Sequence, residues 1–189
     1  YDLLEKAGIK TPKTFKNPKD IDRLCIVKVL EKEREYERAF FFAESFKEYE
    51  TGVAHGISNG KFTEEQVKSA VIEEFIVGVQ VNFNFFYDPI NHRIELVGTD
   101  TRRQTNIEGL TKLPSVYEED VMKKMDIKYE EAGHIAVTVL ESLLEDAFDL
   151  AKRFVKASQE LVKPGVIGPF GLQTMVTPGP PKKEIIVFD

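Results

Sequence analysis

The stretch "VIEEFIVGVQVNFNFFY" at residues 71–87 contains two segments that resemble buried strands, with two adjacent carboxylates, Glu73 and Glu74, between them. Residues 79–87 alternate apolar and polar side chains with a period of two, which predicts a strand with one buried face. Burying a carboxylate costs several kcal/mol unless it is paired. The simpler interpretation is therefore that both acids lie at a solvated bend. The alternative is a hinge whose backbone groups recognise an adenine edge, with Gly78 allowing a sharp turn.

The segments around this stretch predict an α+β protein with mixed and antiparallel sheets and packed helices. On the N-terminal side we expect a short helix ending at Gly8, strands at 24–29 and 39–43, and a helix over 64–70 capped by Thr63 and Gln66. On the C-terminal side the predicted elements are a hairpin through "DPIN", a polar and irregular region over 100–132, a helix with a capping box at Ser142 and Glu145, and two strands within 166–176 and 184–189.

The composition excludes several classes of protein. The 189 residues are 42% hydrophobic and carry a net charge of −6, which is typical of a globular protein and argues against a nucleic-acid partner. The only cysteine, Cys25, lies in an apolar run, so we expect no disulfide framework. Apolar runs fall short of the roughly 18 residues that a membrane span needs. We expect a cytoplasmic protein with no membrane partner.

Lys28 interrupts the apolar segment "LCIVKV" at residues 24–29. A lysine in a buried strand needs a partner for its ammonium or a path to solvent. Composition alone supports equally a functional lysine and an edge strand with an exposed side-chain end.

Two further groups of polar residues suggest ligands. The segment 98–109, "GTDTRRQTNIEG", places Arg102 and Arg103 among hydroxyl and amide side chains, which suits a phosphate but also an ordinary solvated loop. Gln173 and Asp189 lie on the last two predicted strands, and as a hairpin these strands could bring two oxygen ligands to one Mg²⁺. The alternative is that both are polar strand ends. His55, His92 and His134 are too far apart for a helical metal pair, and we interpret each as a surface or capping group.

Four blocks of this sequence resemble, in order and spacing, the archaeal formate-dependent 5-formaminoimidazole-4-carboxamide ribonucleotide synthetases, a family of ATP-grasp ligases. They are "VIEEFIVGVQVNFNFFYDPI", "IELVGTDTRRQTNIEGLTKLP", "AGHIAVTVLESLLEDAF" and "ELVKPGVIGPFGLQ". The resemblance covers nearly the whole chain. It implies an ATP-grasp domain with a nucleotide-binding subdomain over about 10–80 and a substrate- and metal-binding subdomain over about 81–189. Family members carry an additional N-terminal domain and continue after the last strand, so we expect both flanks to be missing from this sequence.

The resemblance also implies roles for individual residues. Lys28 would hold the ATP phosphates and, with Arg102, act in catalysis. Arg102 and Asn106 would bind the substrate ribonucleotide. The adenine hinge would comprise Glu73, Glu74, Phe75 and Val77, and the metal ligands would be Gln173 and Asp189.

The implied reaction belongs to purine biosynthesis. Formate would be activated by ATP as formyl phosphate, which the amine of an aminoimidazole carboxamide ribonucleotide then attacks. The small-molecule partners would be ATP, formate and a phosphorylated amine, with Mg²⁺ as the metal, for which Mn²⁺ can substitute. We expect a homo-oligomer.

Three departures from the family pattern indicate a divergent paralogue. The segment after the strand lysine, "EKEREYERAFF", contains no glycine, whereas a loop that closes over phosphates normally needs glycine. Arg103 and Gln104 replace an aromatic residue and an acid, and Leu140 replaces an arginine. The alternatives to a formate ligase are therefore a ligase for another acceptor and a nucleotide-binding regulatory subunit. A purely structural domain is disfavoured by Lys28 in its strand.

Overall fold

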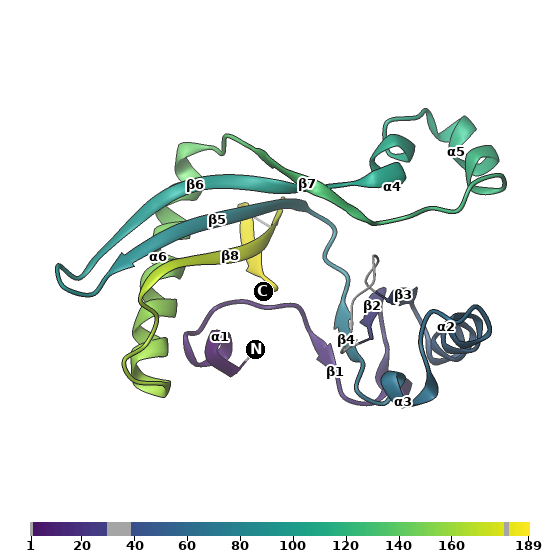
Figure 1. The fold of residues 1–189 in the computed structure, drawn as a ribbon, viewed down its shortest axis with the longest axis horizontal. Coiled ribbons are helices and arrows are strands. Elements are labelled where there is room, and N and C mark those ends of the chain that lie inside the picture. The colour runs from purple at the N-terminus through teal and green to yellow at the C-terminus, as the bar shows by residue number, and fades with distance from the viewer. Residues whose placement is uncertain (1, 30–38, 180–181) are drawn as a thin grey trace. The chain divides into compact units, whose positions relative to one another are not determined.

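The computed structural model describes residues 2–29, 39–179 and 182–189 (Figure 1). The chain divides into two compact units that are built from alternating segments. Unit 1 comprises Tyr1–Pro12, Ile76–Arg102 and His134–Asp189, and unit 2 comprises Lys13–Phe75 and Arg103–Gly133. These limits differ from the single boundary near residue 80 expected from the sequence, because residues 103–133 group with Lys13–Phe75.

Unit 1 contains a five-stranded sheet with the strand order β7-β6-β5-β8-β9. The pairs β5–β6, β5–β8 and β8–β9 are antiparallel. Two of the strands, β6 and β7, extend beyond the limits of unit 1. The elements are α1 (Asp2–Lys6), β5 (Val79–Asp88), β6 (Arg93–Gln104), β7 (Glu131–Ala136), α6 (Glu141–Leu161), β8 (Gly168–Thr177) and β9 (Glu184–Val187).

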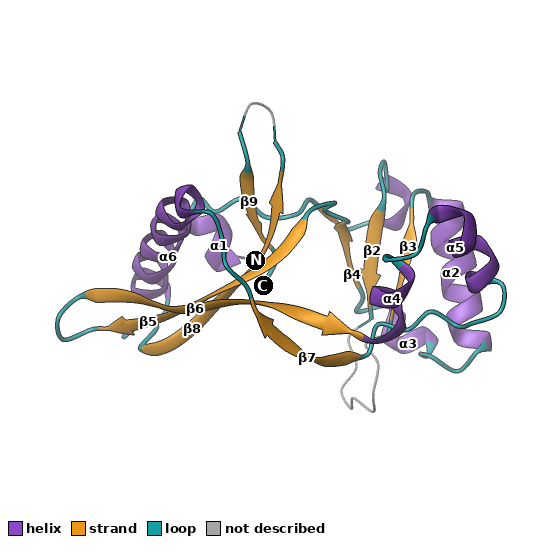
Figure 2. Ribbon diagram, turned by 90° about the horizontal axis from the view of Figure 1, so that it is seen from above, coloured by secondary structure: helices purple, strands orange, loops and turns teal. Residues whose placement is uncertain are grey.

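The period-two pattern of residues 79–87 determines which face of this sheet is buried. Val81, Phe83 and Phe85 belong to one hydrophobic core together with Ala147 and Ala151 of α6. Successive strand residues point to opposite faces, so the residues between these three lie on the other face. The long helix α6 therefore packs on the apolar face of the sheet, as the ribbon views also show (Figures 1 and 2).

Unit 2 contains a four-stranded antiparallel sheet with the order β1-β4-β2-β3. One face packs its apolar residues, among them Cys25, Val27 and Ile72, near Tyr49 of α2. The elements are β1 (Thr14–Phe15), the 3-10 helix η1 (Pro18–Asp20), β2 (Cys25–Lys28), β3 (Phe40–Ala43), α2 (Phe46–Ser58), α3 (Glu64–Val67), β4 (Val71–Glu74), α4 (Thr105–Leu110) and α5 (Ser115–Met122).

Several predicted elements are confirmed. The first helix ends before Gly8, which has a φ of +64°. Helix α3 has the predicted capping box, in which Thr63 and Gln66 bond each other's backbone N–H. The hairpin β5–β6 and the hairpin β8–β9 are also present.

Other predictions are wrong. Helix α6 begins at Glu141 with Leu140 as its N-cap and has no side-chain cap, so Ser142 and Glu145 form no capping box. The region 100–132 is more regular than its polar composition indicates, because β6 continues to Gln104 and two helices follow. Helix α2 is not predicted at all. Among the described residues, no helix is long and apolar enough to cross a membrane.

Candidate active site

Lys28 lies at the end of β2, and β2 is an interior strand of the unit 2 sheet. The edge-strand interpretation of this lysine is therefore wrong. Its Nζ forms an ion pair with the carboxylate of Glu73 on the neighbouring strand β4. The Lys28 side chain is 34% exposed, whereas that of Glu73 is 4% exposed. The ammonium thus neutralises a buried carboxylate and remains accessible from outside the sheet.

The two acids of the opening stretch have separate structural partners. Both belong to strand β4, so the solvated-bend interpretation is wrong for Glu73, which is buried. The Glu74 carboxylate accepts a hydrogen bond from Arg23 Nη1 at 3.2 Å and a longer one from the backbone N–H of Lys13. The ion pair of Glu73 and the hydrogen bonds of Glu74 therefore explain how two adjacent carboxylates are tolerated here.

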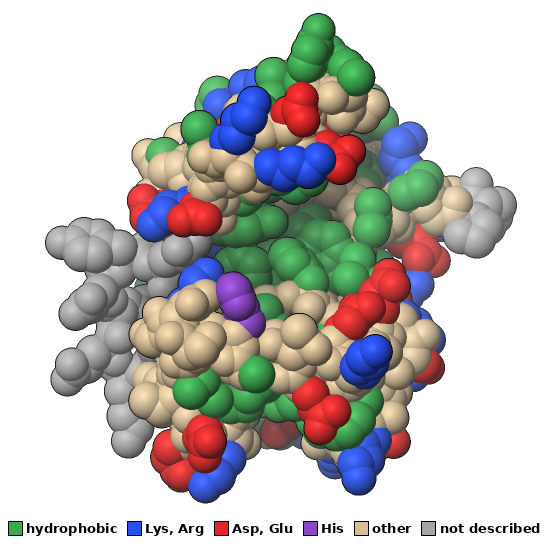
Figure 3. Space-filling model, turned by 90° about the vertical axis from the view of Figure 1, so that its right-hand side faces the viewer, with side chains coloured by type: hydrophobic (Ala, Val, Ile, Leu, Met, Phe, Trp, Pro, Cys, Tyr) green, Lys and Arg blue, Asp and Glu red, His purple; other side chains and the backbone are tan. Residues whose placement is uncertain are grey.

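Aromatic rings surround the same face of the unit 2 sheet. Residues that oppose each other across antiparallel strands have side chains on the same face. In this sheet Lys28 opposes Phe40, and Ile26 opposes Phe42 on one side and Glu73 on the other. The Phe42 ring packs edge-on against Phe75 at 5.2 Å between centroids. Tyr129, from the second segment of unit 2, packs against Phe40 at 4.9 Å. Figure 3 views this side of the molecule and shows hydrophobic side chains in a hollow with charged side chains at its rim.

Two backbone donors of the predicted adenine hinge are already bonded within unit 2. The backbone N–H of Glu74 donates to Lys13 O at 2.8 Å, and that of Phe75 donates to Leu24 O at 2.9 Å. Any backbone N–H group that donates to a bound base would therefore have to belong to a residue after Phe75 in the sequence. Val77, which is 76% exposed, belongs to unit 1. Gly78 lies at a bend of the backbone and has no positive φ. A Cβ at Gly78 would lie 2.7 Å from Val176 O, so close approach to strand β8 is what requires glycine.

The face of the unit 1 sheet opposite α6 is polar. Asn82 on β5 opposes Asp100 on β6 and Gln173 on β8. The Asp100 carboxylate accepts hydrogen bonds from Asn82 Nδ2 at 2.8 Å and from Asn84 Nδ2 at 2.6 Å. His134 Nδ1 on β7 lies 2.5 Å from Asp100 Oδ1. Three strands thus contribute to one hydrogen-bonded cluster, which we call the Asp100 cluster (Asn82, Asn84, Asp100 and His134).

The neighbouring arginines of the 98–109 segment do not act together. Arg102 lies two residues from Asp100 on the same face of β6, and its Nη2 is 3.4 Å from Gln173 Oε1. Arg103, on the opposite face of the strand, bonds Glu108 Oε2 at 2.6 Å. Successive side chains of a strand point to opposite faces of the sheet. A phosphate bound on one face therefore cannot contact both guanidinium groups from that face.

The Asn106 amide is used within unit 2. Its Nδ2 donates to Asp126 O at 2.7 Å, and its Oδ1 accepts from the N–H of Lys128 at 2.6 Å. These two bonds fix the segment that follows α5 to the start of α4. A substrate would have to replace at least one of them in order to bind this side chain. No pattern in the residues around Asn106 indicates this structural role.

Gln173 and Asp189 are neighbours at the end of the β8–β9 hairpin. The N–H of Gln173 donates to Asp189 O at 2.8 Å, and the N–H of Phe188 donates to Gln173 O at 3.0 Å. One amide and one carboxylate oxygen suit Mg²⁺, which commonly keeps several waters and takes few protein ligands. The donor set therefore fits this metal in part. In the part of the chain that the structure describes, there is no group of three His, Cys, Asp or Glu side chains that could hold a metal.

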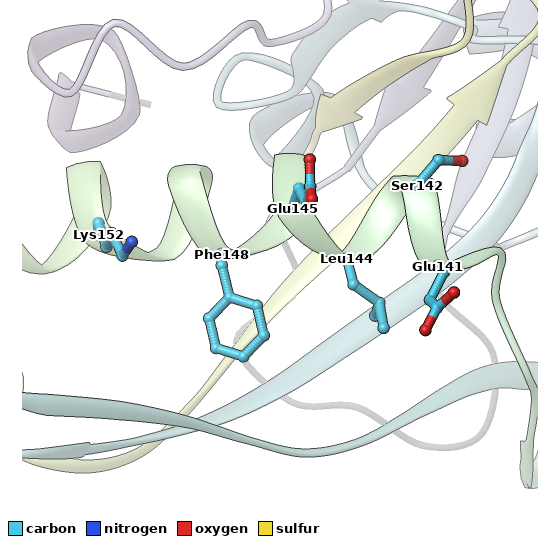
Figure 4. Close-up of a pocket in the computed structure, with 6 residues that line it drawn as sticks. All are labelled: Glu141, Ser142, Leu144, Glu145, Phe148 and Lys152. Carbon is cyan, nitrogen blue, oxygen red and sulfur yellow. The ribbon is translucent and has the colours of Figure 1, made fainter.

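A separate pocket lies along α6, away from the polar face of the sheet (Figure 4). Its lining residues all come from this one helix, namely Glu141, Ser142, Leu144, Glu145, Phe148 and Lys152. Leu144 and Phe148 also pack against the core of unit 1. With acids and one lysine spaced along a single helix, the pocket has no convergent set of polar groups of the kind that ligand sites use.

The family model described as a domain of unknown function, DUF1297, matches residues 48–189, which is most of the chain. The chain belongs to this family. It is 37% identical over 187 residues to the 5-formaminoimidazole-4-carboxamide-1-(beta)-D-ribofuranosyl 5'-monophosphate synthetase of Methanothermobacter thermautotrophicus, covering 99% of this chain and 50% of that protein. The enzyme of the same name from Saccharolobus solfataricus is 37% identical over 188 residues, covering 100% of this chain and 53% of that protein.

Solved structures agree with this relationship. The crystal structure of an IMP biosynthesis protein PurP from Thermococcus kodakaraensis superposes with a TM-score of 0.63 at 26% identity, covering 99% of this chain and 49% of that one. The ADP complex of N5-carboxyaminoimidazole synthetase from Staphylococcus aureus gives a TM-score of 0.60 at 13% identity, covering 100% and 42% of the two chains, which shows a shared fold. This DUF1297 chain is thus a homologue of the archaeal synthetases with an α+β ATP-grasp-like fold. It spans about half the length of the curated relatives it matches.

Three residues on the polar face of the unit 1 sheet are not predicted as site residues from the sequence. Asn82 and Asn84 look like ordinary polar positions of an alternating strand, and His134 looks like a surface histidine. The available signal is the period of β5, which places both asparagines on the face opposite the core. The sequence also predicts that the charged segment 31–38 is mobile without nucleotide and that its Arg34 and Arg38 contact phosphate; this segment lies outside the described residues.

Proposed function

We propose that this protein is an ATP-dependent ligase that joins formate to the amine of an aminoimidazole carboxamide ribonucleotide through formyl phosphate, in the biosynthesis of IMP. The observation that carries the proposal is Lys28, which lies in an interior strand and is partly exposed above the buried Glu73 carboxylate. A structural domain has no need for this buried pair. Replacing such a pair by apolar residues of similar size is often neutral or stabilising.

The surroundings of Lys28 support a nucleotide. A cation on a face lined by aromatic rings suits a ligand with a flat base and an anionic tail. Phe42 and Phe75 supply ring surface beside the Lys28–Glu73 pair. Lys28 would contact the ATP phosphates, with Glu73, Glu74, Phe75 and Val77 around the base.

The polar face of unit 1 supports the acceptor and metal roles. Arg102 would bind the anionic substrate and neutralise charge that develops during transfer, as phosphoryl-transfer sites require. Gln173 and Asp189 would hold Mg²⁺, which supplies further charge neutralisation when bound. Asn106 would contact the ribonucleotide only if it exchanged a bond to the 126–128 backbone for one to the substrate.

The second candidate is a nucleotide-binding regulatory subunit, or a ligase for a different acceptor. It is favoured by the bonds that already engage Arg103 and Asn106 within unit 2, and by the glycine-free sequence after Lys28. Both candidates require ATP to bind. They differ in whether a phosphorylated amine increases turnover.

The test has two parts and uses the full-length protein with Mg²⁺. Calorimetry should show ATP binding that weakens by about 1–3 kcal/mol in Lys28→Ala, the scale of a charge-assisted hydrogen bond. Release of ADP should then depend on formate and on one member of a panel of phosphorylated amines, with the imidazole carboxamide ribonucleotide expected to be active. Absence of any ATP heat would contradict both candidates. ATP binding without stimulation by any amine would favour the regulatory subunit.

A matched pair of variants tests the assignment of Arg102. Contact with an anionic group in both ground and transition states affects KM and leaves kcat unchanged. Arg102→Ala should therefore raise the KM for the amine far more than the KM for ATP. Arg103→Ala is the control, because its guanidinium is bonded to Glu108. Equal effects of the two variants on the amine KM would argue against the assignment.

A further inference from the structure

The segment between β6 and β7 carries apolar side chains that unit 2 does not bury. Within residues 111–126, which include α5, every residue except Glu118 and Val121 is exposed. Tyr117 is 58% exposed and Met125 is 51% exposed. In the part of the chain that the structure describes, none of the hydrophobic core clusters includes a residue of this segment. Large apolar side chains are thus left uncovered along one helix.

The base of this segment is nevertheless fixed. The Asn106 amide donates to Asp126 O at 2.7 Å and accepts from the N–H of Lys128 at 2.6 Å, which ties the two ends of the segment together. Next to this tie, Tyr129 packs against Phe40 of the unit 2 sheet. Helix α5, between the two ends, contributes no buried residue. The fold therefore holds the base in place and presents α5 to its surroundings.

The apolar side chains of α5 form one stripe. Tyr117, Val121 and Met125 follow one another at four-residue intervals, which places them on the same face of a helix. The N–H of Met125 donates to Val121 O at 2.9 Å, so helical hydrogen bonding continues past the end of α5 as far as Met125. A helix this short is marginal in water unless its apolar face is packed. The stripe therefore calls for a cover.

We propose that this stripe packs antiparallel against the same stripe of a second copy of the chain, with a two-fold axis at Val121. This contact goes beyond the proposed function and does not depend on it. The axis places Tyr117 of each copy beside Met125 of the other, a favourable contact between sulfur and an aromatic ring. Two-fold contacts that use the same surface on both copies are the commonest kind in soluble homo-oligomers.

The charged residues beside the stripe favour a second copy over other partners. Asp120 and Lys124 are both exposed and lie on the same side of the stripe, because they are four residues apart. A two-fold axis brings this side of the two helices together in reversed order. Lys124 of each copy then reaches Asp120 of the other. A partner surface of a single charge would attract one of these residues and repel the other.

The order of charges along α5 has a simpler explanation, which covers only part of the arrangement. Acids before bases stabilise a helix through its dipole. Glu119 and Lys123 form an ion pair in this order, at 2.8 Å. Each of them is two residues from Val121, so the pair lies on the face opposite the stripe. The dipole gives no reason for exposed apolar side chains on the other face.

The test measures self-association of the full-length protein by sedimentation velocity over a range of concentrations. Asp120→Lys and Lys124→Glu should each raise the Kd of association by about tenfold or more, because each sets two like charges against one another. The double variant that exchanges both residues should return the Kd to within about threefold of wild type, because every pair is rebuilt with its charges reversed. Any other partner surface would be doubly mismatched by this exchange.

A cysteine placed on the axis gives a second measurement. Val121→Cys should form a disulfide between copies on mild oxidation, because a residue on a two-fold axis faces its own counterpart. Glu119→Cys, on the opposite face of α5, is the control and should form none. The native Cys25 is buried, so wild type should form none either. Each variant should keep the urea unfolding transition of the wild-type monomer, since α5 contributes no buried residue.

Every outcome decides for or against the contact. Restored association in the double variant, together with the Val121→Cys cross-link, would support it. Wild-type protein that stays monomeric at all concentrations, or single variants that associate as wild type does, would overturn it. Loss in the single variants without restoration in the double variant would also overturn it, because the stripe would then be covered by another partner or by the rest of the full-length chain. Equal cross-linking of Val121→Cys and Glu119→Cys would rule out the axis at Val121.

Discussion

At the scale of single residues, the pairing of Lys28 with Glu73 explains why a buried strand contains both a lysine and a carboxylate. Glu73 is almost fully buried, and an unpaired carboxylate there would be costly. The Lys28 ammonium offsets the cost of burying the Glu73 carboxylate, and the carboxylate in turn positions the ammonium. The two predicted site residues are thus one structural unit, which neither residue's sequence context indicated.

Lys28→Met should lower the free energy of unfolding by about 1–3 kcal/mol, less than for a fully buried pair because Lys28 is one-third exposed. The physical cause is the uncompensated Glu73 carboxylate. Adding Glu73→Gln should recover part of the loss, giving a coupling energy of about 0.5–3 kcal/mol in urea unfolding. The exposed pair Lys68–Glu65 is the control and should show a coupling below about 0.5 kcal/mol. Strict additivity at Lys28 and Glu73 would contradict the pairing.

The Asp100 carboxyl should make stability depend on pH in the acid range. Burial raises its pKa, but hydrogen bonds from His134, Asn82 and Asn84 outweigh this effect, so the pKa lies below its ordinary value of 3.8. A carboxyl with a lowered folded pKa contributes stability that is complete above the unfolded pKa and is lost as the pH falls through the folded pKa. The stability advantage of wild type over Asp100→Asn should therefore shrink between about pH 4 and more acidic conditions. Urea unfolding at several pH values measures it, and a constant difference would contradict the lowered pKa.

At the scale of secondary-structure elements, the regular patterns were predictable and the tertiary constraints were not. The alternation in 79–87 correctly identifies β5 and its buried face. Helix α2 escaped prediction because Gly52 and Gly56 interrupt its pattern, yet a Cβ at Gly56 would overlap the Phe62 ring, so packing selects glycine there. Ser45, which caps α2 by accepting from the N–H of Glu48, was the available signal.

Helix α6 offers a direct test of capping. Its N-cap, Leu140, has an extended backbone with φ −64° and ψ 139° but no side-chain acceptor for the free N–H groups of the first turn. Leu140→Asp should therefore stabilise the protein by about 0.5–2 kcal/mol, through a cap bond. Thermal unfolding measures this change. Leu140→Ala is the control and should be close to neutral, since 56% of Leu140 is exposed. Equal stabilities of the two variants would contradict the N-cap assignment.

The substitution Gly78→Ala tests how closely the backbone just before β5 approaches β8. In Gly78→Ala the new Cβ would meet Val176 O at 2.7 Å, so we expect a loss of about 1–3 kcal/mol in the free energy of unfolding. Gly98→Ala is the matched control in the same sheet, because no atom lies within 4 Å of its added Cβ. Urea unfolding of both variants measures the difference. If Gly78→Ala were as stable as Gly98→Ala, the steric explanation would be wrong.

At the scale of the whole molecule, the family resemblance identified the α+β ATP-grasp-like fold correctly, but the division into two interleaved units was not foreseen. Residues 103–133 return to unit 2 because side chains such as Tyr129 pack against its sheet, and a single sequence does not reveal such a long-range contact. For the same reason the site was predicted as isolated residues. The cross-strand partners, Glu73 for Lys28 and Asp100 for His134, became visible only in the structure.

The central claim is that this protein activates formate as an acyl phosphate, and transfer of isotope from formate tests it most directly. The full-length protein is incubated with ATP, Mg²⁺, ¹⁸O-labelled formate and the imidazole carboxamide ribonucleotide, and the released phosphate is analysed by mass spectrometry. The account predicts that each phosphate formed with product carries one oxygen from formate, because the carbon–oxygen bond of formyl phosphate breaks in the transfer step. Turnover that releases only unlabelled phosphate, or ATP binding with no formate-dependent phosphate at all, would contradict it.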